Sequence, residues 1–390
     1  MLAAVYSISG GAEFTYDVSV SAHLAGAPFE PFTGTRYWAG QYPPLQGMAE
    51  AVFFLPLRYF MGEFMAIRLT FIIWEAVAVF LAWLCINRMQ VPERMARMGM
   101  LLLVIMPAGW MTSAVMAQDE FIAGSFLAGS VFLWMRGKRT LAIVLCGLGV
   151  GAGKIFLVLP LLGLMAAAMA EGAGGRPLLA GAVASSAPYL IVALAATLKG
   201  QAVPLLGFTP PFDFSTGIWN LASGYMDISR MTAKRASTAL GLFASLAPLC
   251  WLMLKGELRG ISMDRLALTL VVMLMWFFNI FYHVNPEYYA LVLPLMVLAL
   301  RDIRAILSAY FVLSLPWAVN LFYGLMSAIE SGASGGQGGF IRLFEAVLPG
   351  GPGDYLKAAL IISVICNLAL TAWFTAILVK SRDHDHPEHG

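Results

Sequence analysis

The first aspartate of the chain, Asp17, lies in a stretch rich in aromatic residues that precedes most of the long apolar blocks. A carboxylate at a membrane surface has the chemistry of a general base, a role typically worth about 10²–10⁴ in rate. An aspartate followed by an apolar-periodic segment is also typical of a helix cap. The sequence around Asp17 leaves both interpretations open.

Two adjacent carboxylates, Asp119 and Glu120, form a turn between closely spaced apolar blocks. Acidic residues at the start of a helix interact favourably with the helix dipole, which explains the pair without a function. Contact with a substrate or a metal ion is the functional alternative. Both interpretations stay open at this turn.

A lysine, Lys154, separates two apolar stretches. A cation at the centre of a bilayer costs about 2.5–3.5 kcal/mol on insertion scales. We expect Lys154 either to snorkel at the outer end of a helical hairpin or to face a shared cavity. In a cavity it would bind an anion such as a lipid phosphate.

Glycines stand at every second position from 147 to 153, directly before this lysine. The run does not match a phosphate-binding loop, because that motif requires glycine at 148 and Ser or Thr at 155, where this chain has Leu148 and Ile155. Glycines spaced four residues apart in an apolar segment favour close helix packing. We therefore predict that this segment packs tightly against its neighbours.

A fourth candidate segment contains His283, Glu287 and Tyr288 at the predicted outer end of a helix pair. Histidine is the side chain most easily set to hold a proton or to pair with a phosphate near neutral pH. A capped, hydrogen-bonded turn explains the same residues equally well.

The composition predicts an integral membrane protein. Of the 390 residues, 60% are hydrophobic and 12% are charged, and the mean hydropathy is +0.78, whereas soluble domains contain about 25% charged residues. The apolar blocks are about 17–25 residues long, the length that crosses a hydrocarbon core of ~30 Å. We predict an all-α, polytopic transmembrane bundle of about 11–12 spans. A net charge of +2 without a basic cluster gives no reason to expect a nucleic-acid partner.

The predicted spans lie near residues 63–86, 98–117, 119–135, 140–153, 154–170, 177–197, 234–254, 265–282, 288–300, 305–323 and 355–380, with the short stretch 1–11 as a twelfth candidate. The four cysteines fall inside apolar segments and show neither disulfide nor metal-ligand spacing.

Arginine and lysine residues gather in every second loop, and the positive-inside rule places these loops in the cytoplasm. The basic loops lie at 88–97, 136–139, 176, 255–265, 301–304 and 380–382. The other loops are then extracytoplasmic, at 11–62, 118–120, 153–154, 198–233, 283–287 and 324–353. We predict one domain over 1–380 and a disordered cytoplasmic tail over 381–390.

Residues 45–61 are apolar enough to span, but a span here would place the arginines of 88–97 and 136–139 outside. We therefore predict a juxtamembrane helix that lies in the outer interface, with Glu50 and Arg58 on its wet side.

The order of these motifs resembles a known family. Asp17 and Tyr42-Pro-Pro-Leu45 stand in the first external loop, and Gln118-Asp119-Glu120 follows in the second. Arg-Gly-Lys-Arg, a glycine-rich helix ending in Lys154, and a segment of the form His…Pro-x-Tyr-Tyr…Leu-Pro come next. Over roughly residues 13–320 this set resembles the C-type (GT-C) membrane glycosyltransferases, especially the polyprenyl-phosphate-dependent mannosyltransferases similar to PIG-M and the bacterial phosphatidylinositol-mannoside enzymes.

The resemblance implies a hexosyltransferase of the cell envelope, embedded in a bacterial inner membrane with its site facing the periplasm. Such enzymes move a sugar such as mannose from a polyprenyl-phosphate carrier to a hydroxyl of a glycan, glycolipid or protein, with inversion. Asp17 matches the acid that deprotonates the acceptor, and His283 matches the histidine near the carrier phosphate.

The resemblance also gives roles to the remaining candidates. Lys154 matches the hairpin lysine of the family pattern. Asp119 and Glu120 match its second acidic turn, which positions the sugar or the acceptor. Tyr42, Glu287 and Tyr288 are expected to line the substrate site. No metal site is assigned, because the chain has Asp17-Val-Ser19 where many members have Asp-x-Asp.

Two other classes of function remain. A transporter or flippase of a lipid-linked or small solute is one, but transporters tend to show internal repeats and broken helices, and the two halves show no repeat. A non-catalytic subunit or a polymerase of an envelope glycan is the other. A polymerase is expected to carry arginines in a large external loop, whereas 198–233 carries one only near its end, Arg230.

Overall fold

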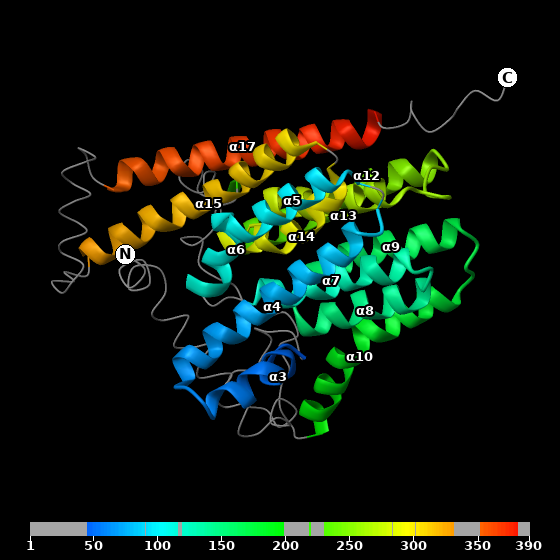
Figure 1. The fold of residues 1–390 in the computed structure, drawn as a ribbon, viewed down its shortest axis with the longest axis horizontal. Helices are drawn as coiled ribbons and strands as arrows, with labels where there is room; N and C mark the ends of the chain where they lie inside the picture. Colours follow the sequence, from blue (N-terminus) through cyan, green and yellow to red (C-terminus); the bar gives the residue numbers. More distant parts are fainter. Residues whose placement is uncertain are drawn as a thin grey trace.

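The computed structural model describes residues 45–89, 91–115, 119–198, 218–219, 230–282, 284–300, 302–330 and 352–380. Every regular element in these ranges is a helix (Figure 1). The predicted all-α class is therefore confirmed for the described part of the chain.

The helices run from α3 to α17 and include three short non-α elements, two 3₁₀ helices and one π-helix. In chain order they are α3 (Gln46–Arg58), α4 (Glu63–Ile86), α5 (Glu93–Ile105), α6 (Pro107–Trp110), the π-helix η2 (Met111–Val115), α7 (Glu120–Met135), α8 (Arg139–Ala152), the 3₁₀ helix η3 (Ile155–Leu157), α9 (Val158–Ala170), α10 (Arg176–Leu198), α12 (Arg230–Leu254), α13 (Met263–Ile280), the 3₁₀ helix η5 (Pro286–Val292), α14 (Leu293–Ala299), α15 (Ile303–Glu330) and α17 (Pro352–Lys380).

Four described helices are long and apolar enough to cross a membrane, and a bent pair raises this number to five. The four are Met65–Ile86, Thr232–Leu254, Met263–Ile280 and Tyr355–Lys380. Other apolar helices, among them α7, α8 and α14, are shorter than a full span. A multi-pass helical membrane protein is supported, while the finer count of 11–12 spans stays a prediction.

The block predicted as one span at 98–117 is instead broken. Helix α5 ends at Ile105, and the chain continues through α6 into η2 at an angle of 42°. Pro107 explains the break, because proline has no N–H to donate to the carbonyl four residues earlier and its ring clashes with that turn. At the other end of the chain, α15 extends to Glu330, so the loop predicted over 324–353 begins later than expected.

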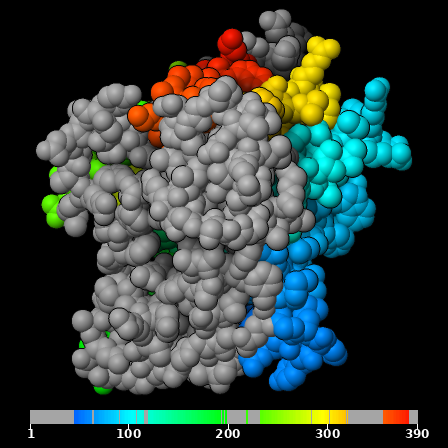
Figure 2. Space-filling view, turned by 90° about the vertical axis from the view of Figure 1, so that its left-hand side faces the viewer, coloured from blue at the N-terminus to red at the C-terminus, as the bar shows by residue number. Residues whose placement is uncertain are grey.

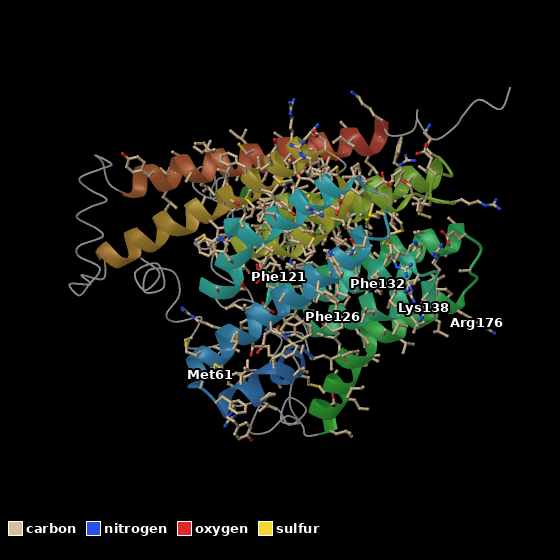
Figure 3. The ribbon with its side chains drawn as sticks, in the orientation of Figure 1. Met61, Phe121, Phe126, Phe132, Lys138 and Arg176 are labelled. Atoms are coloured by element: carbon tan, nitrogen blue, oxygen red, sulfur yellow. The ribbon has the colours of Figure 1, made fainter. Side chains whose placement is uncertain are left out.

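Two basic loops lie at one end of the molecule and the α3–α4 turn at the other. Figure 3 places Lys138 and Arg176 together at the right and Met61 at the left. Seen from the left-hand end, α3 and α4 occupy one edge and α17 another (Figure 2). The arrangement is consistent with the alternation of basic loops that the positive-inside rule requires.

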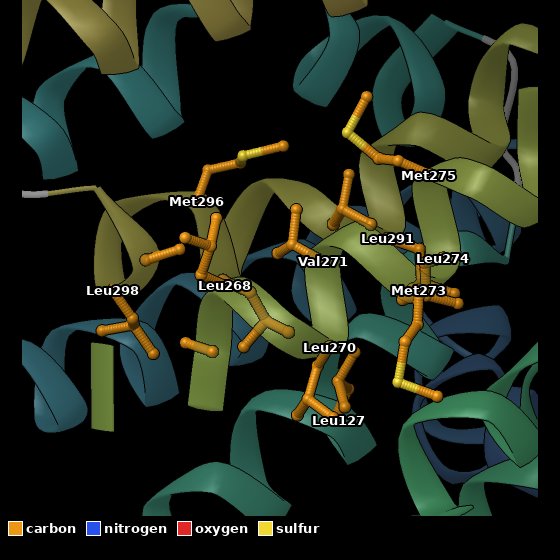
Figure 4. Packing of buried hydrophobic residues seen from close by; sticks show 14 of the residues in the cluster. Leu127, Leu268, Leu270, Val271, Met273, Leu274, Met275, Leu291, Met296 and Leu298 are labelled. Atoms are coloured by element: carbon orange, nitrogen blue, oxygen red, sulfur yellow. The ribbon is translucent and has the colours of Figure 1, made fainter. Parts of the chain in front are cut away.

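Helix α13 forms the centre of the bundle. Its leucine, valine and methionine side chains pack against α7, η5 and α14 in one apolar cluster (Figure 4). Its opposite side bonds to α17, where Asn279 Nδ2 donates to Thr371 Oγ1 at 2.6 Å. Hydrogen bonds of this kind between helices stabilise association in lipid, where there is little hydrophobic force between helices.

Helix α3 has 13 residues and is therefore about 20 Å long, which is too short to span a hydrocarbon core of about 30 Å. The prediction that Glu50 lies on its wet side is wrong. Glu50 is buried, and its Oε1 accepts a hydrogen bond from Gln46 Nε2 at 3.0 Å. A carboxylate that accepts a hydrogen bond within its own helix can be buried at lower cost, and the i,i+4 spacing of Gln46 and Glu50 provides that bond.

The glycines of α8 and its C-cap Gly153 pack closely against neighbouring helices, as predicted, and they do so on two faces. A Cβ at Gly147 would lie 2.9 Å from Ala184 Cβ of α10, and one at Gly149 would lie 2.7 Å from Phe126 Cβ of α7. A Cβ at Gly153 would lie 2.7 Å from the Cα of Ala123. The glycine run therefore brings α8 into close contact with both neighbours.

We predict that Gly153→Ala destabilises the protein by about 1–3 kcal/mol, the usual range for overpacking, because Ala123 contributes backbone as well as side-chain atoms to the clash. Thermal unfolding of the purified protein in detergent measures this change. Gly175→Ala is the matched control, since nothing lies within 4 Å of its Cβ position. Equal midpoints for the two variants would contradict the packing assignment.

Candidate functional site

The α7–α8 hairpin brings two of the predicted site segments together. Glu120 begins α7, Arg139 begins α8, and Lys154 follows the end of α8. Because Gly153 packs directly on Ala123 of α7, the next residue, Lys154, lies beside the start of α7. The local packing of glycine on alanine therefore positions the lysine.

The ammonium group of Lys154 lies between the two carboxylates. Its Nζ is 2.8 Å from Asp119 Oδ1 and 2.9 Å from Glu120 Oε1. Nζ also lies 5.3 Å from the centre of the Tyr288 ring, within the range of a cation–π interaction. We call these four residues the Lys154 cluster.

The cluster is buried. The side chain of Lys154 is 15% exposed, that of Asp119 is 5% exposed, and that of Glu120 is fully buried. Lys154 therefore does not snorkel to water, which was one of the two interpretations of its sequence position.

The carboxylates have more acceptor capacity than the described residues use. Lys154 contacts one oxygen of each acid, while Asp119 Oδ2 and Glu120 Oε2 are buried and accept no hydrogen bond from the described part of the chain. A buried acceptor without a donor costs about 1–3 kcal/mol. These two oxygens therefore have acceptor capacity that the described residues leave unused.

One side of the cluster is aromatic. The ring of Tyr288 lies 5.0 Å from that of Phe156 and 6.0 Å from that of Phe278, measured between centroids. Phe156 also contacts Phe277 and Phe281. These rings fix Tyr288 and keep water away from that side of the ion pairs, which strengthens them.

The cluster lies inside the molecule at the end of short helices. Helix α7 has 16 residues and α8 has 14, about 24 Å and 21 Å long, and both start or end next to the basic turn at Lys138. They are therefore too short to reach the opposite end, where Met61 lies, and Figure 3 shows Phe121 well inside that end. The side chains of the acidic turn are buried within the protein, and its position on the extracytoplasmic side stays a prediction.

The structure describes only one of the other predicted site residues. Glu287 is buried next to Tyr288 in η5. Asp17, Tyr42 and His283 lie outside the described residues. Asp119, Glu120, Lys154 and Tyr288 are thus brought into contact, Glu287 adjoins them, and the assignments for the other three remain predictions.

A second polar contact was missed from the sequence. Glu75, in the apolar helix α4, accepts a hydrogen bond from Ser113 Oγ of the π-helix η2. Its Oε1 lies 3.0 Å from the point where a Cβ on Gly109 would stand. An acid inside a span is itself a functional signal, and Glu75 could have been identified on that basis.

Within the described residues, no three His, Cys, Asp or Glu side chains are placed to hold a metal ion. The comparisons with known proteins add no relative. No protein-family model matches the chain, and no curated protein matches it either.

We predict that Lys154→Gln destabilises the protein by about 3–5 kcal/mol, because it leaves two carboxylates buried without a cation. Adding Asp119→Asn and Glu120→Gln to this variant should restore most of the lost free energy of unfolding, because no buried charge then remains in the cluster. Denaturant unfolding in detergent measures both effects.

The control for this series is Arg97→Gln, which removes an ion pair with Glu93 that is 77% exposed on both sides. Exposed pairs contribute about 0–1 kcal/mol. If Lys154→Gln lowered the free energy of unfolding by no more than Arg97→Gln does, the ion pairs of the cluster would not stabilise the protein.

Proposed function

We propose that the protein is a membrane glycosyltransferase that moves a hexose from a polyprenyl-phosphate carrier to an acceptor hydroxyl at the extracytoplasmic face. The observation that supports this proposal most is the Lys154 cluster. Lys154 lies within ion-pair distance of both Asp119 and Glu120, and the family resemblance assigned all three residues, from two separate segments, to substrate contact.

The cluster fits the recognition of a sugar better than the binding of a phosphate. The ammonium group of Lys154 is already paired with two carboxylates, those of Asp119 and Glu120, so the cluster has no excess positive charge to offer a phosphate. The uncommitted oxygens of the two acids are acceptors, and sugar hydroxyls are donors. We therefore assign to Lys154 the role of holding the two carboxylates in place, rather than that of binding the carrier phosphate.

The position of the cluster fits a carrier-linked donor. The polyprenyl tail of such a donor lies in the bilayer and its phosphate lies at the headgroup level. The cluster lies at the end of α7 and α8 opposite the basic turn at Lys138 (Figure 3). On the positive-inside rule this is the extracytoplasmic side.

In the proposed reaction the acceptor oxygen attacks the anomeric carbon of the sugar. The bond from this carbon to the acceptor oxygen forms while the bond to the carrier phosphate oxygen breaks, and the configuration inverts. Asp17 takes the proton of the acceptor hydroxyl, and the polyprenyl phosphate leaves with the bonding electrons. His283 stabilises the charge that develops on that phosphate.

Transport of a lipid-linked or small solute is the second candidate, and one observation favours it. Glu75 contacts a π-helical segment beside the break at Pro107. Broken helices and ionisable groups in the membrane interior are common at transporter binding sites, and π-helical turns are frequent at functional sites.

We predict that Asp17→Asn lowers the rate of sugar transfer by about 10²–10⁴, the usual contribution of a general base. Purified protein in lipid, supplied with radiolabelled polyprenyl-phosphate mannose and membrane lipids, gives the rate. Glu30→Gln, which changes another carboxylate of the predicted first loop, is the control and should keep the activity. Unchanged transfer by Asp17→Asn would remove Asp17 from the reaction, and no transfer by wild type across plausible donors would favour the alternatives.

Glu75→Gln separates the two candidate functions. An enzyme whose site is the Lys154 cluster should keep its transfer rate in this variant, because the amide still accepts the hydrogen bond from Ser113. Flux measurements in proteoliposomes, run on the same preparations, test for transport. Solute or lipid flux that is lost on Glu75→Gln, in a protein without transfer activity, would favour the transporter.

A further inference from the structure

A groove of about 400 Å³ lies between helices α12, α13 and α17, which lie side by side in the upper part of Figure 1. Its lining residues are mostly apolar: Ala244, Ala247, Pro248, Trp251, Trp276, Thr375, Leu378 and Val379. The hydroxyl of Thr375 accepts a hydrogen bond from Trp276 Nε1 at 3.1 Å. The polar groups of these two residues therefore satisfy each other, and the walls of the groove suit a hydrocarbon chain.

Basic side chains lie at one end of the groove. Lys255 follows α12, and its backbone N–H bonds to the carbonyl of Trp251, one turn earlier. Lys380 directly follows the lining residue Val379. Both lysine residues are exposed. Arg265 lies at the same end, where its guanidinium pairs with Glu257 and donates to the carbonyl of Leu378 at 3.4 Å.

This end of the groove lies on the side of the molecule that holds the other basic loops. The loop after α12 and the last turn of α17 lie toward the right of Figure 1, the side on which Figure 3 labels Lys138 and Arg176. On the positive-inside rule this side is cytoplasmic. Anionic lipids attract basic residues at a cytoplasmic membrane surface by about 1 kcal/mol for each lysine or arginine.

The groove also offers a donor near the headgroup level. The indole N–H of the lining residue Trp251 has no acceptor among the described residues. Tryptophan is enriched at this depth of a membrane, where an apolar ring and a polar N–H are both satisfied. The ester carbonyl of a bound lipid would accept a hydrogen bond from the indole N–H of Trp251.

We propose that the groove is a binding site for an anionic phospholipid, with one acyl chain between α12 and α17 and the phosphate between Lys255 and Lys380. A partner helix does not fit, because a helix with its side chains is about 10–12 Å wide and the groove is too small to hold a segment of one. A zwitterionic lipid would fill the groove, but its headgroup would be attracted less strongly by the two lysine residues. The site is separate from the Lys154 cluster and does not depend on the proposed enzymatic function.

The test compares two lipids that share their acyl chains, phosphatidylglycerol and phosphatidylcholine, by native mass spectrometry of the full chain in mild detergent. Wild type should bind phosphatidylglycerol on the order of ten times more tightly, given two lysine residues at the headgroup. The double variant Lys255→Gln and Lys380→Gln should lose this preference while its binding of phosphatidylcholine stays unchanged. Ala247→Trp, at an exposed lining position, should weaken the binding of both lipids by filling the groove.

The control is the double variant Lys138→Gln and Arg176→Gln, which removes two exposed cations at the same end of the molecule but away from the groove. It should keep the preference for phosphatidylglycerol. Equal affinities of wild type for the two lipids would overturn the proposal, as would an equal loss in the control. Unchanged binding by Ala247→Trp would show that the lipid does not occupy the groove.

Discussion

The balance of charge around Lys154 is the constraint on which the rest of the site depends. One ammonium group and two carboxylates occupy a region from which water is largely excluded, and the two carboxylates can be buried there only because the ammonium group lies between them. The balance requires that the end of α8 meet the start of α7, which the contact of Gly153 with Ala123 provides. The site and the packing of the hairpin are therefore one structural feature.

The same balance limits what the cluster can recognise. A lysine that is already paired with Asp119 and Glu120 adds no net attraction for an anion, so specificity rests on the oxygens that remain free to accept. Hydrogen bonds to charged groups contribute about 1.5–3 kcal/mol each, and they depend strongly on direction. A polyhydroxyl ligand is therefore favoured over a compact anion, which is why the cluster supports sugar transfer more than phosphate binding.

Composition and spacing predicted the helical class and the packing faces of α8, because both follow from local rules of hydropathy and side-chain volume. The partner of Lys154 could not be chosen from the sequence, since Asp119 and Glu120 lie more than thirty residues away and only the tertiary packing unites them. The contact between Glu75 and Ser113 was missed for the same reason, since these residues are 38 positions apart. The count of spans stays open because α7, α8 and α14 are shorter than a bilayer is thick.

The hydrogen bond between α13 and α17 has a consequence for the assembly of the protein. Asn279 and Thr371 are 92 residues apart in the chain, so a ribosome makes α13 well before α17. The amide of Asn279 therefore enters the membrane while its acceptor does not yet exist, and a polar group without a partner is costly in hydrocarbon. Insertion of α17 relieves that cost, which ties the order of synthesis to the packing of α13 and α17.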